Sequence, residues 1–287
     1  MRLLLLTTLT MVAFAANSVL NRLAVNQYAM DPAAFAVIRV ASGVVVLWVL
    51  IRARGLGWPG GNPLRRVGAA AALALYMIGF SLAYLSLDTG VGALILFGGV
   101  QMTMFGGAAL SGETVGLARG MGALTALVGL AVLVWPSADV ALPLEGTVLM
   151  AMAAVGWGIY SLMGRSEEVP LAATGANFVL CLPMVIPLAW LGTGETSLAG
   201  IALSVIAGGV TSGLGYALWY AVVPGLGAMR AGVAQLSVPL IAALGGLVFL
   251  DEALGWRFVV ASVLVLGGIG LSLLATVGRP TRKDPSA

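Results

Sequence analysis

Runs of about 20 mainly apolar residues recur along the whole chain, separated by short polar or turn-forming breaks. A helix of that length, at about 1.5 Å rise per residue, crosses the roughly 30 Å hydrocarbon core of a bilayer. Prolines mark several of the breaks, as at Pro32, Pro63, Pro143, Pro170 and Pro224. The pattern predicts ten membrane-spanning helices, near residues 3–25, 32–53, 66–88, 91–111, 117–136, 144–165, 170–192, 198–222, 226–249 and 255–277.

Two segments of the first half of the chain recur, with low identity, in the second half. Residues 14–22 (FAANSVLNR) align with residues 157–165 (WGIYSLMGR), and residues 83–93 (AYLSLDTGVGA) align with residues 218–228 (LWYAVVPGLGA). Because each half holds five predicted spans, an odd number, the two copies enter the membrane from opposite sides. Such inverted repeats are typical of transporters, whose substrate site lies between the two halves.

The spans and the repeat together predict an all-α integral membrane protein, with two inverted five-helix repeats around a central cavity. We expect the first repeat at residues 1–137, the second at residues 138–278 and a short basic tail at residues 279–287. The start of the chain, Met1-Arg2 followed by an apolar stretch, also resembles a secretory signal. Its removal would break the five-plus-five arrangement, so we expect this segment to remain as the first span.

Composition favours a bilayer as the solvent and removes several kinds of chemistry. Hydrophobic residues make up 60% of the chain and charged residues 9%, and the mean hydropathy is +1.06. A soluble core cannot bury that much apolar surface. The chain has no histidine and one cysteine, which excludes an intrachain disulfide and the usual zinc ligand and proton carrier. We therefore expect neither a metal nor a cofactor.

The basic residues predict the orientation in the membrane. If the N-terminus is cytoplasmic, most of them fall on the inner side, whereas the outer span ends hold only Arg22 and Arg257. The positive-inside rule therefore places both termini in the cytoplasm. This distribution also explains the net charge of +3 better than binding to nucleic acid does, because the charges are scattered over several loops and the tail.

Neutral amides lie at depth in the predicted spans, where polar groups are costly and usually face a cavity or a partner helix. Asn17, Gln101 and Gln235 are the candidates for hydrogen bonds to the polar ends of a solute. A neutral amide binds a zwitterion without adding net charge, so the solute can be released again. We found no Asp or Glu convincingly in the middle of a span.

Three further residues are predicted to have structural or gating roles. Arg39 lies about 10 Å into the bilayer, counted from Pro32, and Asn177 holds the equivalent position in the second repeat. Arg39 could grip a substrate carboxylate or brace carbonyls of neighbouring helices. We favour bracing, because an arginine open to the cavity would hold an anion too tightly for release. Pro239, one turn after Gln235, should kink its helix.

Aromatic residues at three- and four-residue spacing form faces on several predicted helices. Packing between helices and a wall for binding rings both fit this pattern. Tyr84 and Trp219 align in the repeat but lie near opposite ends of their spans, so a carrier could use them as outer and inner gates. The aromatic candidates for the site are Tyr76, Phe80 and Tyr84, then Phe97, then Trp157 and Tyr160, and finally Tyr216, Trp219 and Tyr220.

At these positions the chain resembles the drug/metabolite transporter superfamily in its ten-helix form with two EamA repeats. The resemblance rests on residues 17–22, on residues 32–39 and on Glu113 and Glu252 after the fourth and ninth spans. Within the superfamily it is most similar to the YddG-type bacterial aromatic amino-acid exporters. This resemblance implies a multi-pass carrier of the bacterial inner membrane that exports aromatic amino acids and related small amphipathic metabolites.

The residues and the resemblance together predict an exporter that works by alternating access. We expect little or no proton coupling, because the spans offer no carboxylate or histidine relay. The expected partners are the aromatic amino-acid substrate and the lipid bilayer, without nucleic acid, and the carrier is expected to be a monomer. A carrier for another metabolite or drug class is the main alternative. An intramembrane enzyme is less favoured, because no catalytic constellation is visible.

Overall fold

The structure, a computed structural model, describes residues 1–110, 116–135, 142–165, 167–190, 192 and 194–274. All regular elements in these ranges are helices, which confirms the predicted all-α class. They are α1 (Arg2–Asn26), α2 (Pro32–Ala53), α3 (Pro63–Ala83), α4 (Thr89–Leu110), α5 (Leu117–Val134), α6 (Leu144–Gly164), α7 (Pro170–Val185), η1 (Ile186–Trp190), α8 (Leu198–Ile206), η2 (Ala207–Leu214), α9 (Gly215–Gln235), α10 (Ser237–Leu250) and α11 (Trp256–Leu274). The predicted tail, residues 279–287, lies outside the described residues.

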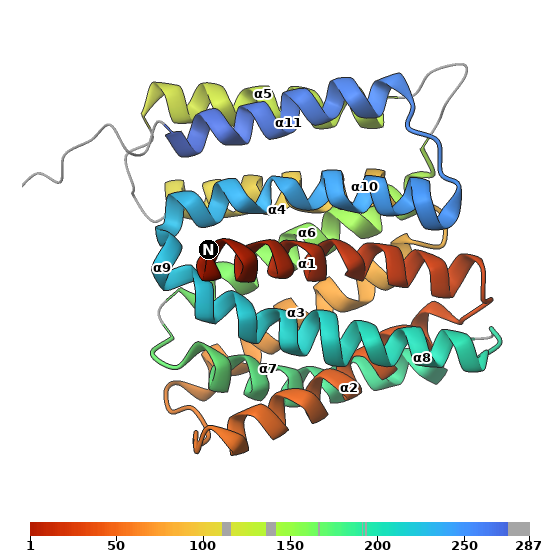
Figure 1. Ribbon diagram of the computed structural model, residues 1–287, viewed down its shortest axis with the longest axis vertical. Coiled ribbons are helices and arrows are strands. Elements are labelled where there is room, and N and C mark those ends of the chain that lie inside the picture. Colours follow the sequence, from red (N-terminus) through yellow and green to blue (C-terminus); the bar gives the residue numbers. More distant parts are fainter. Residues whose placement is uncertain (111–115, 136–141, 166, 191, 193, 275–287) are drawn as a thin grey trace, which may run out of the picture.

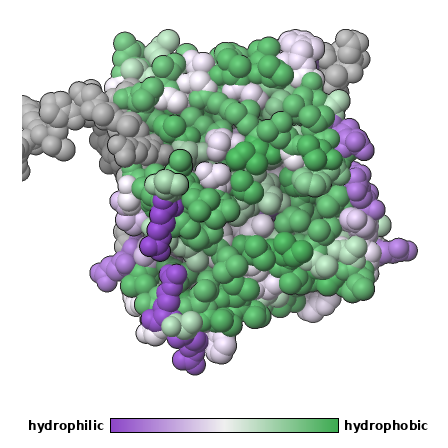
Figure 2. Space-filling model, in the orientation of Figure 1, coloured by the Kyte–Doolittle hydropathy of each residue, from purple (hydrophilic) through white to green (hydrophobic). Residues whose placement is uncertain are grey.

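The helices have the length and composition of membrane spans. Within the described ranges, nine helical stretches are long and apolar enough to cross a bilayer, and a shorter apolar helix covers Gly120–Val134. Large apolar side chains such as Val45, Leu124 and Val263 are exposed on the outer surface. Hydrophobic residues cover the face seen in Figure 2, and hydrophilic residues gather towards the two edges where the helices end. The predicted multi-pass membrane protein is thus confirmed.

The spans lie roughly parallel to one another and form one bundle (Figure 1). α5 and α11 run side by side at one edge of the bundle, and α2, α7 and α8 lie at the opposite edge. Helices of the first half pack against helices of the second half throughout, as α3 does against α6 and α4 against α10. The centre of the bundle is therefore built from both halves of the chain.

Local sequence explains where helices begin. Asp31 Oδ1 accepts a hydrogen bond from Ala34 N (2.9 Å) at the start of α2. Asn62 Oδ1 accepts one from Leu64 N (2.9 Å) at the start of α3. A proline follows each cap, where its fixed φ suits a first helical residue and its missing N–H costs nothing. These caps fix the first residues of α2, which carries Arg39, and of α3, which carries Tyr76.

Small residues allow the two halves to approach closely along α3 and α6. A Cβ on Gly156 would lie 2.7 Å from Ala72 O and 2.8 Å from Tyr76 N, and a Cβ on Gly79 would lie 2.6 Å from Leu149 O. In lipid, where apolar side chains gain little from leaving the solvent, such backbone contact is a main source of helix association. Tyr76 is thereby held at the interface between the halves.

Two helix boundaries differ from the prediction. A break was expected at Pro224, but α9 continues through it to Gln235. The apolar stretches on either side of the observed boundary are Leu198–Leu226 and Val233–Leu250. Pro239 lies in the first turn of α10, where no intrahelical N–H bond is required. The helix therefore divides just before Pro239, between α9 and α10, rather than kinking in the middle of a ninth span.

The middle of the eighth span is a π-helix, η2, which the sequence pattern did not predict. Its wider turns carry Thr211 and Ser212, both of which hydrogen-bond Asn17 of α1. π-helical turns are uncommon and often occur at functional sites. This segment is packed against α1 and α2, so it joins the second half of the chain to the polar groups of the first.

Candidate functional site

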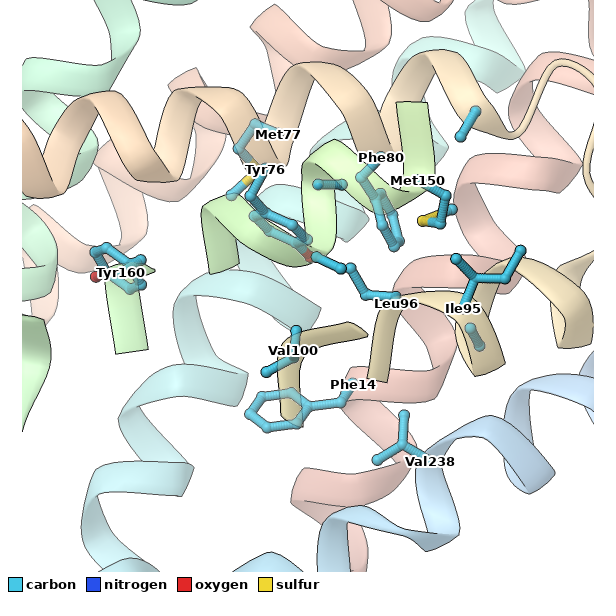
Figure 3. Close-up of a cluster of buried hydrophobic side chains, with 14 of the residues drawn as sticks. Phe14, Tyr76, Met77, Phe80, Ile95, Leu96, Val100, Met150, Tyr160 and Val238 are labelled. Carbon is cyan, nitrogen blue, oxygen red and sulfur yellow. The ribbon is translucent and has the colours of Figure 1, made fainter. Parts of the chain in front are cut away.

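A cavity of about 720 Å³ lies in the centre of the bundle, lined by α1, α3, α4, α5, α6, α9 and α11. Figure 3 shows the buried cluster at its wall, with Tyr76 and Phe80 on α3, Leu96 and Val100 on α4, and Phe14 on α1. The volume falls in the range of about 300–1,000 Å³ that is usual for small-molecule sites. A cavity of this size between two helical halves can enclose a metabolite.

The cavity extends from the middle of the bundle towards the side that holds the N-terminus. Its lining reaches Arg165, which follows α6, and Ser272 in the last turn of α11. The lining residues nearest to the opposite side are Ser18, Phe80 and Leu96. The cavity therefore reaches the N-terminal side of the bundle and ends before the other side, which we call the closed side.

Aromatic rings from both halves form a continuous wall. Trp157 lies 4.8 Å from Tyr76 and 5.3 Å from Tyr216 between ring centroids. Phe14 lies 5.9 Å from Tyr216 and 5.7 Å from Trp219. The planes are tilted or edge-on, as the ring quadrupoles favour. A planar ring that enters the cavity meets faces and edges of this kind on several sides.

Two amides also line the cavity. Gln101 of α4 and Gln235 at the end of α9 are half-buried and line it. No hydrogen bond joins either side-chain amide to another described residue, so the oxygen and nitrogen atoms of both are available to a solute. Each amide offers acceptors and donors without a net charge.

The structure brings together nine of the twelve residues predicted to bind substrate. They are Asn17, Tyr76, Phe80, Phe97, Gln101, Trp157, Tyr216, Trp219 and Gln235. Tyr84, Tyr160 and Tyr220 share helix faces with cavity residues but do not line the cavity. Helical spacing alone predicts a shared face, and the depth and rotation of each helix decide which of its residues reach the opening.

The three other tyrosines have partners elsewhere. Tyr160 donates to Thr174 Oγ1 (3.3 Å), which lies 2.8 Å from Tyr220 Oη. This cluster ties α6, α7 and α9 together away from the cavity. Tyr84 is fully buried and donates to Thr89 O (3.4 Å) on the closed side. Asn177 is also buried outside the cavity wall, and its Oδ1 has no partner among the described residues.

Arg39 is fully buried behind the cavity wall. Its Nε donates to Ser212 Oγ (3.2 Å) and its Nη2 donates to Tyr76 Oη (3.0 Å). Its guanidinium carbon also lies 4.8 Å from the Phe80 ring centroid, a cation–π distance. Arg39 thus contacts hydroxyl groups of both halves and two rings of α3, whereas the sequence favoured contacts with backbone carbonyls.

An ion-pair network closes the side opposite the N-terminus. Arg22 Nε lies 3.1 Å from Glu252 Oε1, and its Nη1 donates to Tyr84 O (2.9 Å). Glu252 Oε2 accepts from Thr89 N (2.8 Å) at the start of α4. Asp88 pairs with the same arginine at 3.4 Å. These contacts join the two halves across the closed end, while Glu113, the counterpart of Glu252 in the repeat, lies outside the described residues.

Several lining residues were missed by sequence reasoning. Phe14 is one, although the repeat aligns it with Trp157, so the alignment could have identified it. Arg165, the repeat counterpart of Arg22, is exposed at the cavity mouth and was read only as an orientation signal. Met102 and Met104 also line the cavity, and no sequence pattern distinguished them from packing residues.

A metal centre is not visible in the described part of the chain, where no group of three or more His, Cys, Asp or Glu side chains could hold an ion. The fold is that of a polytopic membrane protein with a solute-sized cavity between two helical halves, an arrangement typical of transporters.

Comparison with known proteins specifies this class further. The sequence profile of the EamA-like transporter family matches residues 144–274. An uncharacterized protein of Pseudomonas aeruginosa is 43% identical over 98% of this chain and 98% of its own length. A protein of known crystal structure has a similar fold, with a TM-score of 0.63 and 20% identity over 93% of this chain and 97% of that one. The chain belongs to the EamA-like transporter family, a family of transporters rather than enzymes.

Proposed function

We propose that the protein exports aromatic amino acids and related small amphipathic metabolites across the bacterial inner membrane by alternating access. The observation that carries the proposal is the lining of the central cavity, which combines aromatic rings of both halves with two neutral amides that have no hydrogen-bond partner among the described residues. Each ring pair contributes about 0.5–1.5 kcal/mol beyond simple burial, so an aromatic side chain gains more there than an aliphatic one of equal area.

The proposed direction of transport follows from the charges at the ends of the bundle. Arg52, Arg54, Arg65 and Arg66 lie on the same side as the N-terminus, which is the cytoplasmic side by the positive-inside rule. The cavity then opens to the cytoplasm and accepts solute from inside the cell. Release requires a second state, in which the Arg22–Glu252 end opens and the Arg165 end closes.

Truncating a cavity tryptophan tests the aromatic site. With labelled tryptophan, phenylalanine and leucine in proteoliposomes, we expect saturable counterflow of the two aromatic amino acids and little flux of leucine. Trp219→Ala should lower the apparent kcat/KM for tryptophan by about tenfold, because the substrate loses a ring contact and its burial. Trp190→Ala, which changes an exposed tryptophan outside the cavity, is the matched control. Equal loss in both variants, or equal flux of leucine, would contradict the proposal.

Transport is expected to follow the solute gradient without a coupled proton. At the closed end Arg22 and Glu252 are paired with each other, and within the described spans no carboxylate lies at the depth of the cavity. A pH-sensitive dye inside sealed vesicles should therefore report no pH change in proportion to tryptophan flux. A fixed ratio of protons to tryptophan would refute this part of the proposal.

A carrier of broader specificity is the second candidate, favoured by Met102 and Met104 in the lining. Methionine side chains adapt to ligands of different shape. The flux assay separates the candidates, since a broad carrier would also move aromatic amines or dyes that lack an amino-acid head group.

A further inference from the structure

Arg39 carries a charge that the described protein does not neutralise. Its side chain is fully buried, its Nη1 has no hydrogen-bond partner, and its other contacts are the hydroxyl groups of Ser212 and Tyr76. The ion pairs among described residues involve Arg22 and Arg66 instead. A buried cation without a counter-ion is costly, and the ring of Phe80 offsets only part of that cost. This part of the wall therefore favours an anion.

Hydrogen bonds connect the Arg39 guanidinium to two residues that line the cavity, one directly and one through Ser212. Tyr76 Oη accepts from Arg39 Nη2 (3.0 Å), so its own O–H remains free to donate. Ser212 Oγ accepts from Arg39 Nε (3.2 Å) and donates in turn to Asn17 Oδ1 (3.2 Å). Both Tyr76 and Asn17 line the cavity. The arginine thus lies one side chain behind the surface that a solute meets.

Counting donors and acceptors shows what Asn17 offers to a solute. Its Oδ1 accepts from Ser212 Oγ (3.2 Å) and lies 2.7 Å from Thr211 Oγ1, whose one hydrogen is shared between this oxygen and Ala207 O (2.8 Å). Its Nδ2 makes one long bond, to Ala13 O at 3.4 Å, and has a second hydrogen left. Asn17 and Tyr76 thus each have a hydrogen left to donate, and both are connected to Arg39, Tyr76 directly and Asn17 through Ser212. Two donors backed by a positive charge suit a carboxylate.

We propose that Tyr76 Oη and Asn17 Nδ2 bind the carboxylate of the transported solute, and that Arg39 strengthens this site from behind the wall. The inference rests on the proposed function, because it assigns one end of the solute to one part of the same cavity. It also explains how a buried arginine is compatible with transport. The guanidinium attracts the anion through intervening hydroxyl groups and makes no bidentate pair with it, so binding stays weak enough for release.

The second half of the chain has no counterpart of the buried Arg39. The position equivalent to Arg39 holds the neutral Asn177, and the hydroxyl cluster of Tyr160, Thr174 and Tyr220 lies outside the cavity wall. The positive end of the site is thus fixed by the first half. The amide oxygens of Gln101 and Gln235 remain as acceptors for an ammonium group at the other end of a zwitterion.

Matched ligand pairs test the carboxylate site by direct binding to the purified full-length protein. The readout is tryptophan fluorescence or thermal stabilisation in detergent, with each acid compared with an amine of similar size that has no carboxylate. The pairs are tryptophan and tryptamine, 3-phenylpropionate and phenethylamine, and octanoate and octylamine. The wild-type protein should bind each acid at least about tenfold more tightly than its amine, the ratio expected for a charge-assisted hydrogen bond.

Two substitutions locate the site. Tyr76→Phe removes the free O–H, and Asn17→Ala removes the amide donor. Each should reduce the preference for the acid over the amine by about tenfold, because acid binding weakens more than amine binding. Asn21→Ala is the matched control, because Asn21 is equally buried on α1, donates to Phe80 O (3.4 Å) and does not line the cavity. If Tyr76→Phe does not fold, Asn17→Ala with its control decides the question alone.

The outcomes separate this inference from the proposed function. Binding of octanoate but not of tryptophan or 3-phenylpropionate would support the carboxylate site and refute the aromatic substrate. Acids and amines that bind equally, or a preference for acids that persists in both variants, would overturn the carboxylate site even if aromatic amino acids are transported. Failure of any acid to bind the wild-type protein would also overturn it.

Discussion

Replacing Gly208 with alanine is expected to destabilise the protein strongly, because Gly208 packs against the backbone of a neighbouring helix. A Cβ at this position would overlap the backbone oxygen of Arg39 and Ser42 Oγ, and would lie 2.7 Å from the carbonyl carbon of Arg39. The obstacle is backbone on a neighbouring helix, which cannot rotate away as a side chain can. We expect a loss of about 3 kcal/mol, the upper end for over-packing, since α2 and η2 must separate.

Gly267→Ala is the matched control, because a Cβ at that position meets nothing within 4 Å. Alanine is a better helix former than glycine by about 0.5–1 kcal/mol, so this variant should be neutral or slightly more stable. Thermal unfolding of both variants in detergent, with the fraction of monodisperse protein, measures the contrast. Equal unfolding temperatures for the two would show that α2 and η2 do not meet as closely as described.

The fold was predictable because its main determinants are local. Apolar runs of membrane length and the turn residues between them fix the number and direction of spans. The exceptions concern helix irregularities. Pro224 reads as a break, yet α9 continues through it. The π-turns of η2 arise where Gly208 packs against the backbone of Arg39, a contact between residues far apart in the sequence.

The site was only partly predictable, because side-chain spacing gives the face of a helix but not its rotation in the bundle. Trp219 and Tyr216 line the cavity, whereas Tyr220, on the same predicted face, contacts Thr174 instead. The role of Arg39 could not be derived at all, since Ser212 and Tyr76 come from distant spans. The ion pair between Arg22 and Glu252 could not be derived either, because the two residues lie near opposite ends of the sequence.

Neutralising Glu252 is expected to open the closed side of the carrier. Its two oxygens serve different helices, since Oε1 pairs with Arg22 of α1 and Oε2 accepts from Thr89 N at the start of α4. The side chains of Arg22 and Glu252 are only 12% and 10% exposed, so water screens their attraction little. Charge-assisted hydrogen bonds of this kind contribute about 1.5–3 kcal/mol each. Glu252→Gln should therefore raise the population of the oppositely open state by about tenfold or more.

Asp88 provides the matched control, because it pairs with the same arginine from the surface. Its side chain is 53% exposed and lies 3.4 Å from Arg22 Nη2, and such pairs contribute about 0–1 kcal/mol. Asp88→Asn should therefore shift the equilibrium by no more than a few-fold. The two substitutions remove the same charge from the same network, so a difference between them reports on burial rather than on net charge.

Cysteine labelling from one side of the membrane measures this shift. Phe97→Cys places a thiol in the cavity wall, and Cys181→Ala removes the native buried thiol. With an impermeant maleimide applied opposite the N-terminal side, labelling should be slow in this background, about tenfold faster with Glu252→Gln and nearly unchanged with Asp88→Asn. The ion pair holds one end shut only while the other end is open, so labelling from the N-terminal side should slow in the same variant. Unchanged rates on both sides would mean that the helices, and not the Arg22–Glu252 pair, keep this end closed.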